Sequence, residues 1–379
     1  MLRPVVSGLQ KGHTPSIRCP TVKIARRNPQ QIKSMPESTP FGDAHHRSGN
    51  KQIPKRQRIV VLGASGFIGR SVVEKLAASD WALPVAISHR TALDLAIPVE
   101  TVRLDARQPA ALQAVLLDAA GVVNCITGDS ETIIASAGAL FATCSRMTPL
   151  PRIVHLSTMM VYGSATGTVD ETAALRGDWD AYSAAKTEVE QMARTCRTVV
   201  HLRPGIVYGP RSPIWSGRIG RWLRQHRLGD LGVAGAGFCN LVHVDDVVEA
   251  VDRALRTPGI EGEAFNLSLP SPPTWNDYFC QFAAALGAAL VPISRIRIIL
   301  EQHVLAPPLK IAEKLSPILP FRWRPPDPIR PWLLRLCSHP MRMDVRKAER
   351  MLGIEWTPLD KGLRESAAWV LAREKAETA

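Results

Sequence analysis

The sequence has no long apolar run and no closely spaced pair of cysteines. No apolar stretch reaches the roughly 18 residues that a membrane-spanning helix needs, so we expect no transmembrane segment. The seven cysteines are scattered without any Cys-x-x-Cys pair, which argues against a zinc site and against a disulfide framework. We therefore predict no metal centre and expect free thiols in the cytoplasm.

The net charge of the chain belongs to two segments. The net charge is +13; residues 1–54 hold nine Lys or Arg against two acids, and residues 291–343 hold nine against three. The rest of the chain is therefore neutral. A basic chain suggests nucleic acid as a partner, but no nucleic-acid-binding module is recognisable, and we expect none to bind.

Residues 1–54 are rich in Pro, Ser, Gln, Arg and Lys and poor in large apolar side chains. Such a composition buries too little surface to offset the entropy of ordering, so we expect a disordered basic tail. The segment lacks the continuous apolar centre of a secretory signal and resembles an organellar transit peptide only faintly. A tail, or a start codon assigned too early, is the interpretation that we prefer.

Residues 58–70 read Arg-Ile-Val-Val-Leu-Gly-Ala-Ser-Gly-Phe-Ile-Gly-Arg. The apolar, largely β-branched run before the first glycine is typical of a parallel strand covered on both faces. Gly63, Gly66 and Gly69 allow a sharp turn, a close approach to a pyrophosphate and tight packing of the next helix. That helix, expected at about 67–78, points its amides at a phosphate. We predict a dinucleotide-binding turn; a turn without a ligand is the alternative.

Strand and helix signals alternate along the first half of the chain. We expect strands at 84–88, 101–104, 121–127 and 153–156, and helices near 108–118 and 131–146. This alternation predicts an α/β fold with a doubly wound parallel sheet, whose ligand crevice lies beyond the carboxyl ends of the strands. Asp105, Gly128 and Ser157-Thr158 follow such strand ends and are expected to meet there.

The end of the second strand bears on the choice of cofactor. In the NAD form of this fold an acid binds the ribose 2′-hydroxyl there, whereas a basic residue accommodates a 2′-phosphate. Arg90 stands where the acid would be. We therefore predict NADP as the preferred cofactor and NAD as the alternative, with a solvated loop residue as the other interpretation of Arg90.

Tyr182 and Lys186 are four residues apart in the helix-forming stretch Tyr-Ser-Ala-Ala-Lys. This spacing places both side chains on one face of a helix. An ammonium beside a phenol favours the phenolate, so we expect a lowered tyrosine pKa that suits proton transfer. Thr158 adds a hydroxyl that orients a substrate oxygen. The tyrosine and lysine alone are common on structural helices; their place after a glycine-rich turn favours catalysis.

Five motifs occur in order along the chain. They are Gly-Ala-Ser-Gly-Phe-Ile-Gly (63–69), His-Leu-Ser-Thr-Met-Met-Val-Tyr-Gly (155–163), Tyr-Ser-Ala-Ala-Lys (182–186), Leu-Arg-Pro-Gly-Ile-Val-Tyr-Gly-Pro (202–210) and Leu-Val-His-Val-Asp-Asp-Val (241–247). Together they resemble the extended short-chain dehydrogenase/reductase family, the group of NAD(P)-dependent epimerases, dehydratases and reductases. The likeness runs from about residue 56 to 290, with a looser one at 344–370.

The resemblance implies roles for single residues. Tyr182 is the acid/base, Lys186 holds the nicotinamide ribose and tunes Tyr182, and Thr158 is their hydroxyl partner. Asp105 contacts the adenine, and Pro204-Gly205 line the nicotinamide. The residues expected to bind the cofactor are Gly63, Ser65, Gly66, Phe67, Ile68, Gly69, Arg90, Asp105, Gly128, Tyr182, Lys186, Pro204 and Gly205.

Two departures from the family pattern bear on the substrate. Met159-Met160 stands where similar sugar-nucleotide dehydratases carry an acidic pair, so we expect no dehydratase activity. Ile206 stands where many sugar-nucleotide members have an asparagine, whereas sterol-type dehydrogenases tolerate an apolar residue there. We predict an epimerase or reductase that transfers a hydride to or from a secondary alcohol or ketone carbon of a nucleotide-sugar. A sterol- or lipid-type dehydrogenase and a non-catalytic NAD(P)-binding subunit are the alternatives.

The chain is expected to divide after its tail. Residues 55–210 form mainly a Rossmann-type NAD(P)-binding domain and 211–379 mainly a smaller, mostly helical substrate-binding part, with 241–256 returning to the Rossmann core. Residues 215–237 are expected as a loop and helix over the crevice. The aromatic residues of a helix at 275–286 build core rather than bind a ligand.

Residues 291–343 combine basic, apolar and aromatic side chains. Such a segment can lie peripherally on an anionic membrane, with Trp323 and Trp332 at the interface. We prefer a lid whose apolar side packs on the body, and a third interpretation is that its arginines bind a substrate diphosphate. The expected partners are a small-molecule substrate and, as an open alternative, a second copy in a homodimer.

Overall fold

The computed structural model describes residues 56–378 except 94, 96, 301–307, 309–328 and 330. The tail predicted at 1–54 and Trp323 therefore lie outside the described residues, as does much of 291–343. No described helix is both long enough and apolar enough to cross a membrane. Cys125, Cys144, Cys196, Cys239 and Cys337 are free thiols.

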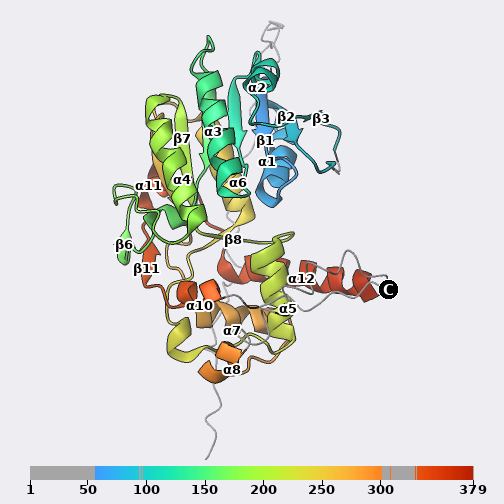
Figure 1. The fold of residues 1–379 in the computed structure, drawn as a ribbon. Helices are drawn as coiled ribbons and strands as arrows, with labels where there is room; N and C mark the ends of the chain where they lie inside the picture. The colour runs from blue at the N-terminus through green and yellow to red at the C-terminus, as the bar shows by residue number, and fades with distance from the viewer. Residues whose placement is uncertain are drawn as a thin grey trace, which may run out of the picture. The chain divides into compact units, whose positions relative to one another are not determined.

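A parallel sheet of seven strands organises the first part of the described chain (Figure 1). Its strands are β1 Gln57–Leu62, β2 Ala82–Ser88, β3 Glu100–Arg103, β4 Gly121–Asn124, β5 Arg152–Leu156, β7 Val199–Pro204 and β10 Ala264–Leu267. Their order is β10-β7-β5-β4-β1-β2-β3, and all neighbours run parallel. The order reverses between β1 and β4, so this is the predicted doubly wound sheet, with its crevice at the carboxyl ends of these strands.

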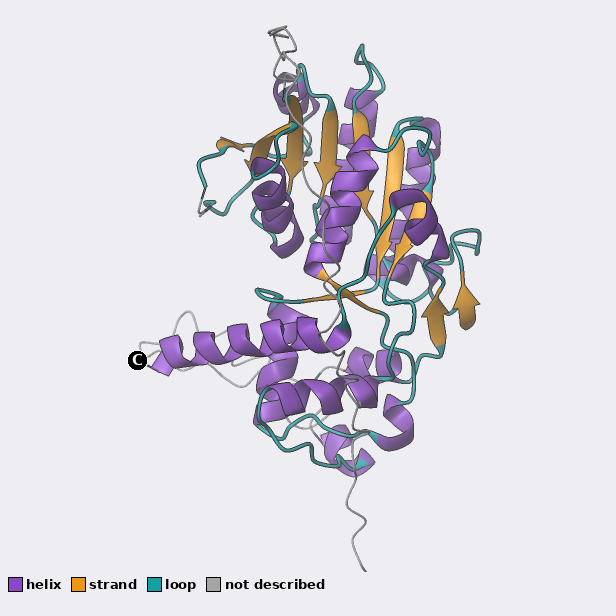
Figure 2. Ribbon diagram, turned by 180° about the vertical axis from the view of Figure 1, so that it is seen from behind, coloured by secondary structure: helices purple, strands orange, loops and turns teal. Residues whose placement is uncertain are grey.

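Helices cover both faces of the sheet (Figure 2). On one face lie α1 Phe67–Ala77, α6 Val244–Arg256 and α11 Arg346–Leu352, and on the other α2 Pro109–Leu116, α3 Ser130–Cys144 and α4 Ala181–Met192. The side chains of β1 explain this arrangement. Ile59 and Val61 pack into one core with α1 and α6, whereas Val60 and Leu62 pack into another with α2 and α3. A strand buried on both faces needs the continuous apolar run seen in the sequence.

A group of helices gathers beyond the carboxyl ends of the strands (Figure 1). It comprises the π-helix η3 Pro213–Arg218, α5 Ile219–Arg224, α7 Trp275–Ala285, α8 Arg295–Leu300, α10 Pro331–Cys337 and α12 Leu359–Thr378. Trp275, Tyr278, Phe279 and Phe282 of α7 are fully buried in its core, as predicted. This group therefore has a core of its own, built largely from aromatic side chains.

Two short sheets connect the layers. In one, β6 Gly167–Val169 pairs with β11 Met341–Met343, and in the other β8 Ile206–Tyr208 pairs with β9 Leu241–His243. Three-residue strands with distant partners carry too little alternation to be predicted from sequence. Short 3-10 helices occur at η1 Met159–Tyr162, η2 Ala193–Thr195 and η4 Gly232–Gly235.

Candidate active site

The glycine turn joins β1 to α1, and its backbone conformation requires glycine at two positions, Gly63 and Gly69. Gly63 has φ +74°, and a Cβ there would lie 2.9 Å from the backbone of Cys125. A Cβ at Gly69 would lie 2.3 Å from the carbonyl oxygen of Gly63. Gly66 is the N-cap of α1, and no side chain caps the helix. The first amides and the positive dipole end of α1 therefore suit a pyrophosphate.

A cavity of about 500 Å³ lies beside this turn. It brings together nine of the predicted site residues: Gly66, Phe67, Ile68, Gly69, Thr158, Tyr182, Lys186, Pro204 and Gly205. The five predicted residues that do not line it are Gly63, Ser65, Arg90, Asp105 and Gly128. The structure thus unites the glycine turn with the three predicted catalytic side chains at one end of the sheet.

Arg90 and Asp105 follow β2 and β3 outside this cavity. Arg103 donates to the backbone carbonyl oxygens of His89 and Arg90, each at 2.9 Å, while the side chain of Arg90 is exposed. Asp105 accepts hydrogen bonds from the side chain and backbone N–H of Arg107, and these bonds hold its pKa well below the usual range. Asp105 is therefore an ionised acceptor, and its contact with the adenine stays a prediction.

A capping box sets the start of α4. The Asp180 carboxylate accepts from the Ser183 amide at 2.8 Å, and the Ser183 hydroxyl oxygen accepts from the Asp180 amide at 2.9 Å. Because this cap fixes where the helix begins, it also fixes which residues of its first two turns face the sheet. Tyr182 and Lys186, one turn apart, both face the cavity.

Lys186 is buried against the ends of two strands. Its Nζ donates to the carbonyl oxygen of Leu156 at 2.8 Å and to that of Ile126 at 3.4 Å. Burial lowers the pKa of Lys186 to about 8. The side chain is therefore mostly charged at neutral pH but close to its titration range.

The pKa of Tyr182 is raised, so the lowered value expected from the spacing is wrong. Burial raises the pKa of the phenol, and the neighbouring Thr158 hydroxyl offsets this only in part. The same burial that brings the two side chains together removes water from the phenol, and the ammonium of Lys186 is bonded to carbonyl oxygens instead. The phenol of Tyr182 is therefore neutral at neutral pH.

Thr158 lies where β5 ends and η1 begins. Its Oγ1 accepts a hydrogen bond from the amide of Met160 at 3.2 Å, as the N-cap of η1. Because this contact uses a lone pair, the hydroxyl proton stays available for donation, and the neighbouring Tyr182 phenol is one acceptor. Thr158 and Tyr182 therefore lie next to each other on the cavity lining.

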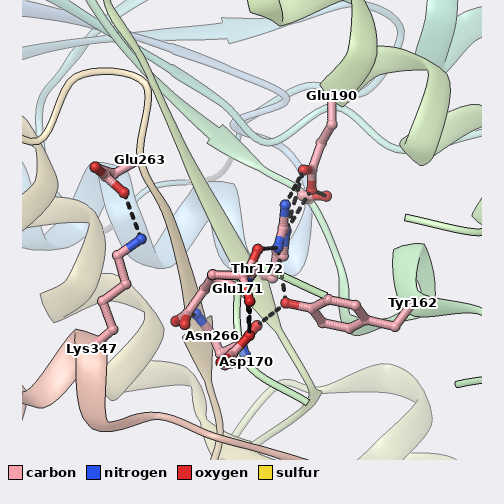
Figure 3. Close-up of polar contacts among 10 residues, drawn as sticks. Tyr162, Asp170, Glu171, Thr172, Glu190, Glu263, Asn266 and Lys347 are labelled. Carbon is pink, nitrogen blue, oxygen red and sulfur yellow. Dashed lines mark hydrogen bonds and ion pairs between the residues drawn. The ribbon is translucent and has the colours of Figure 1, made fainter. Parts of the chain in front are cut away.

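A buried ion pair, which we did not predict from the sequence, lies behind Thr158 and Lys186 and fixes the elements that carry them (Figure 3). Glu190 lies one turn beyond Lys186 on α4. Its carboxylate accepts hydrogen bonds from Nη2 of Arg203 at 2.6 Å and from Nε at 3.0 Å. Burial tends to raise the pKa of Glu190, but the hydrogen bonds from Arg203 hold it below its usual value. The pair is thus ionised, and it joins α4 to β7 just before Pro204-Gly205.

Further hydrogen bonds extend the pair to β5 and β10. The Ser157 hydroxyl, next to Thr158, donates to the Glu190 carboxylate at 2.5 Å. Arg203 donates to the Tyr162 hydroxyl at 2.9 Å, which donates to Asn266 at 2.6 Å. The signal for Glu190 was present in the sequence, because it continues the four-residue spacing of the catalytic helix face.

A larger cavity, of about 830 Å³, lies on the other side of this network. Residues that line it include Glu171, His201, Glu263 and Lys347, but neither the glycine turn nor Tyr182. Glu263 and Lys347 form an ion pair of 2.6 Å within it (Figure 3). Size alone would favour this cavity as the active site. The glycine turn, Thr158, Tyr182 and Lys186 line the smaller cavity instead.

One cluster among the described residues has the residue types and spacing of a metal site: His243, Asp245 and Glu365. His243 is the N-cap of α6, and its Nδ1 accepts from the Asp245 amide at 3.4 Å. Its Nε2 lies 3.5 Å from the Glu365 carboxylate. Because the His243 side chain already caps α6 through Nδ1, we assign this cluster to helix capping.

The far end of the catalytic cavity is apolar. Met160 and Ile206 line it beside Thr158, and Trp215 and Trp332 line it from the helical part. Trp215 lies in the segment that was expected over the crevice. Trp332, predicted either on a lid or at a membrane interface, is part of the cavity wall.

The model of the NAD-dependent epimerase/dehydratase family matches residues 59–268, more than half of the chain. The chain belongs to this family. As a family member it is an NAD-dependent enzyme of the epimerase/reductase type, and the matched region contains the glycine turn, Thr158, Tyr182 and Lys186. The predicted family is confirmed.

Relatives of this epimerase/dehydratase family member have modest identities. The 2′-dehydrokanamycin reductase of Streptomyces kanamyceticus is 26% identical over 248 residues, which span 62% of this chain and 69% of that protein. Protein YeeZ of Escherichia coli (strain K12) is 31% identical over 140 residues, which span 36% of this chain and 47% of that protein. The match thus covers about two thirds of the reductase but less than half of YeeZ.

Solved structures confirm the predicted fold of the family member. The UDP-glucuronic acid 4-epimerase of Bacillus cereus, in complex with UDP-glucuronic acid and NAD, has a TM-score of 0.64 at 20% identity, over 84% of this chain and 100% of that chain. The UDP-glucose 4-epimerase of Thermotoga maritima, with UDP-glucose, has a TM-score of 0.62 at 19% identity, over 84% and 100%. At such identities the likeness concerns the fold alone.

Proposed function

We propose that this enzyme transfers a hydride between C4 of a nicotinamide dinucleotide and a secondary alcohol or ketone carbon. The observation that carries the proposal is that Thr158, Tyr182 and Lys186 line one cavity with the glycine turn. The bound cofactor supplies or accepts the hydride. Reduction of a ketone to an alcohol also consumes one proton, which a protein side chain must deliver to the oxygen.

Tyr182 is the proton donor in this proposal. Burial keeps its phenol neutral, and the Thr158 hydroxyl donates a second hydrogen bond to the same substrate oxygen. Lys186 holds the nicotinamide ribose, as the resemblance implies, and its nearby charge stabilises the phenolate that remains after proton transfer. In the oxidative direction the same groups act in reverse, and Tyr182 accepts the proton of the alcohol.

The outcome of the reaction distinguishes an epimerase from a reductase. In an epimerase the hydride returns to the opposite face of the ketone, whereas in a reductase it leaves with the product. Both need only the three side chains described. Elimination of water needs a further acid and base, and Met159-Met160 offers neither, so we do not propose a dehydratase.

We propose NADP as the preferred dinucleotide. The exposed basic side chain of Arg90 follows β2 at the place where an acid selects NAD, and this supports the proposal. The solved relatives contain NAD, which shows what those enzymes bind. Titration with NADPH and NADH is the measurement; tighter binding of NADH would refute the preference.

Two substrate classes are candidates for the reacting alcohol. A nucleotide-sugar is supported by the solved relatives that contain UDP-sugars. A sterol- or lipid-type alcohol is supported by Ile206, an apolar residue at the wall of the cavity. Peripheral membrane association through 291–343, a homodimer and a cytoplasmic location stay predictions, and a non-catalytic cofactor-binding subunit is the alternative function.

Replacing Tyr182 with Phe tests the reaction. Tyr182→Phe removes the proton donor, so we expect NADPH oxidation with a set of UDP-sugars and cyclic ketones to fall at least about 100-fold. The affinity for NADPH, measured by fluorescence titration, should change less than twofold. Tyr208→Phe is the matched control, because among the described residues the Tyr208 hydroxyl has no hydrogen-bond partner. A fully active Tyr182→Phe enzyme would refute the assigned mechanism.

A further inference from the structure

The catalytic cavity has a wall that the proposed hydride transfer does not explain. We name the aromatic wall the apolar residues that line the cavity away from the glycine turn: Met160, Ile206, Ile214, Trp215, Trp332 and Leu336. They come from η1, β8, η3 and α10. We infer that the aromatic wall binds an uncharged, apolar ring system, and that the alcohol or ketone substrate carries no diphosphate. This inference rests on the proposed function, whose substrate class it chooses.

The two tryptophans of the wall form a supported corner. Trp215 and Trp332 meet edge to face, with ring centroids 6.0 Å apart and an interplanar angle of 82°. Behind them, the Trp275 ring lies 5.7 Å from that of Trp215, and the Tyr278 hydroxyl donates to the Trp215 carbonyl oxygen. Because fully buried residues hold Trp215 from behind, the corner is prepared for a ligand instead of being formed by it.

The wall leaves large apolar side chains open at the cavity. Trp332 is 38% exposed and Ile214 is 37% exposed, and both line the cavity. Exposed apolar groups beside a cavity are typical of a ligand site, because a bound apolar group removes them from water. An apolar ring against Trp332 satisfies this requirement, whereas a phosphate does not.

Charges on the cavity lining disfavour a diphosphate. Among the described lining residues only Asp180 and Lys186 are charged. Lys186 is bonded to the carbonyl oxygens of Leu156 and Ile126, and Asp180 is the N-cap of α4 and repels an anion. The α1 amides at the glycine turn serve the cofactor's pyrophosphate, so a substrate diphosphate at the far end of the cavity needs charge-assisted hydrogen bonds from other side chains, usually arginines, to offset the loss of its hydration.

The arginine of α10 next to the wall is occupied elsewhere. The Arg335 guanidinium carbon lies 4.0 Å from the centre of the Trp179 ring, and Nη1 donates to the Trp179 carbonyl oxygen at 3.2 Å. This stacking holds Trp179, another apolar lining residue, at the cavity. Arg335 thus strengthens the apolar surface and does not line the cavity itself.

Binding to an inactive complex tests the substrate class without requiring turnover. We suggest the full-length Tyr182→Phe enzyme saturated with NADPH, with 2-decalone as the apolar ring ketone and UDP-glucose as the nucleotide-sugar. Calorimetric titration should give a Kd for 2-decalone at least tenfold below that for UDP-glucose. Tighter binding of UDP-glucose, or no binding of 2-decalone at millimolar concentration, would overturn the inference.

Variants of α10 tie the affinity to the wall. Trp332→Ala in the same complex should weaken 2-decalone binding at least about tenfold, and Trp332→Phe, which keeps a ring, should restore most of it. Leu334→Ala is the control on the same helix, because Leu334 packs in the core but does not line the cavity. The affinity for NADPH should stay unchanged in all three. Unchanged binding of 2-decalone to Trp332→Ala would contradict the inference.

Turnover by the unmodified enzyme separates this inference from the proposed function. NADPH-dependent conversion of a UDP-sugar would overturn the apolar substrate while supporting hydride transfer. If 2-decalone and larger fused-ring ketones bind through Trp332 but none is ever reduced, the assigned reaction fails while the substrate class holds. Reduction of a fused-ring ketone, lost in Trp332→Ala, would support both.

Discussion

Lys186 carries its charge inside the protein. Only 2% of its surface is exposed, and the two hydrogen-bond partners of its Nζ are backbone carbonyl oxygens. Two neutral acceptors compensate only part of the lost hydration of an ammonium, which is why its pKa falls to about 8. The buried charge of Lys186, for which we propose a catalytic role, thus costs stability.

The stability cost of Lys186 depends on pH. Its pKa falls from 10.5 to about 8 on folding, so the penalty is fully present below pH 8, shrinks between pH 8 and 10.5, and is absent above. Lys186→Met should therefore raise the free energy of unfolding at pH 7 by about 2 kcal/mol, and by much less at pH 10. Urea unfolding at both pH values measures this. Lys361→Met, on the surface of α12, should show no such difference, and an equal gain at both pH values for Lys186→Met would contradict the account.

The Glu190–Arg203 pair is the second residue-scale feature. Glu190→Gln leaves the Arg203 charge buried without its partner and should lower the free energy of unfolding by about 3 kcal/mol. Glu190→Leu combined with Arg203→Met removes both charges and should recover most of this loss. Glu263→Gln breaks the more exposed pair with Lys347 and should cost less than about 1 kcal/mol. Equal losses for Glu190→Gln and Glu263→Gln in urea unfolding would count against the buried pair.

Between residue and fold, the turn from β1 to α1 decides where a cofactor can lie. Its backbone passes so close to itself that a Cβ at Gly69 would meet the Gly63 carbonyl oxygen. The carbonyl belongs to backbone that is also packed against Cys125, so it cannot easily yield. The strand, the turn and the N-terminus of α1 are therefore packed as one unit, and this packing requires that residue 69 has no side chain.

Gly69→Ala tests that element. The added methyl group must push α1 away from the turn, so we expect NADPH affinity to fall at least tenfold and the unfolding free energy to drop by about 2 kcal/mol. Gly138→Ala, within helix α3, is the control. A Cβ at Gly138 meets only the flexible end of the Met192 side chain of α4. This variant should leave NADPH affinity unchanged. Fluorescence titration with NADPH and urea unfolding of both variants measure these effects. A Gly69→Ala protein with unchanged affinity and stability would disprove the close approach of residue 69 to the Gly63 carbonyl oxygen.

For the whole molecule, the cofactor cavity joins the sheet to the group of helices beyond its strands. Residues of β5, α4 and β8 line it together with Trp215 and Trp332 from the helical group. A ligand in this cavity contacts both parts and stabilises the folded state as a unit. The effect on stability follows from the ratio of its concentration to its Kd.

Thermal unfolding with each dinucleotide tests this at the scale of the whole chain. NADPH at 100 times its Kd should add about 2.7 kcal/mol of stability and raise the Tm by a few degrees. NADH at the same concentration should raise the Tm less if Arg90 accommodates the 2′-phosphate. Arg90→Glu should reverse the order of the two shifts without changing the Tm of the free protein. A larger shift with NADH in the original chain would contradict the proposed preference.

The sheet was predictable because its signals are local. The run at 59–62, the glycines after it and the alternation that follows each lie within about a dozen residues, and they recur as β1, α1 and the next strands. The small sheets β6–β11 and β8–β9 were not predictable, because each joins three-residue strands that are far apart in sequence. The partner of Glu190 was likewise hidden, since nothing local to α4 points to Arg203 on β7.

The sequence by itself determined the family, the doubly wound sheet and the side chains that meet at the glycine turn, because spacing along one strand or one helix sets which face a residue occupies. Only the tertiary structure decided their environment. Burial of Tyr182 and Lys186 sets the direction of their pKa shifts, and the packing of α10 brings Trp332 beside Trp215. Proton affinity and cavity shape depend on atoms from many distant segments at once, and no local pattern contains that information.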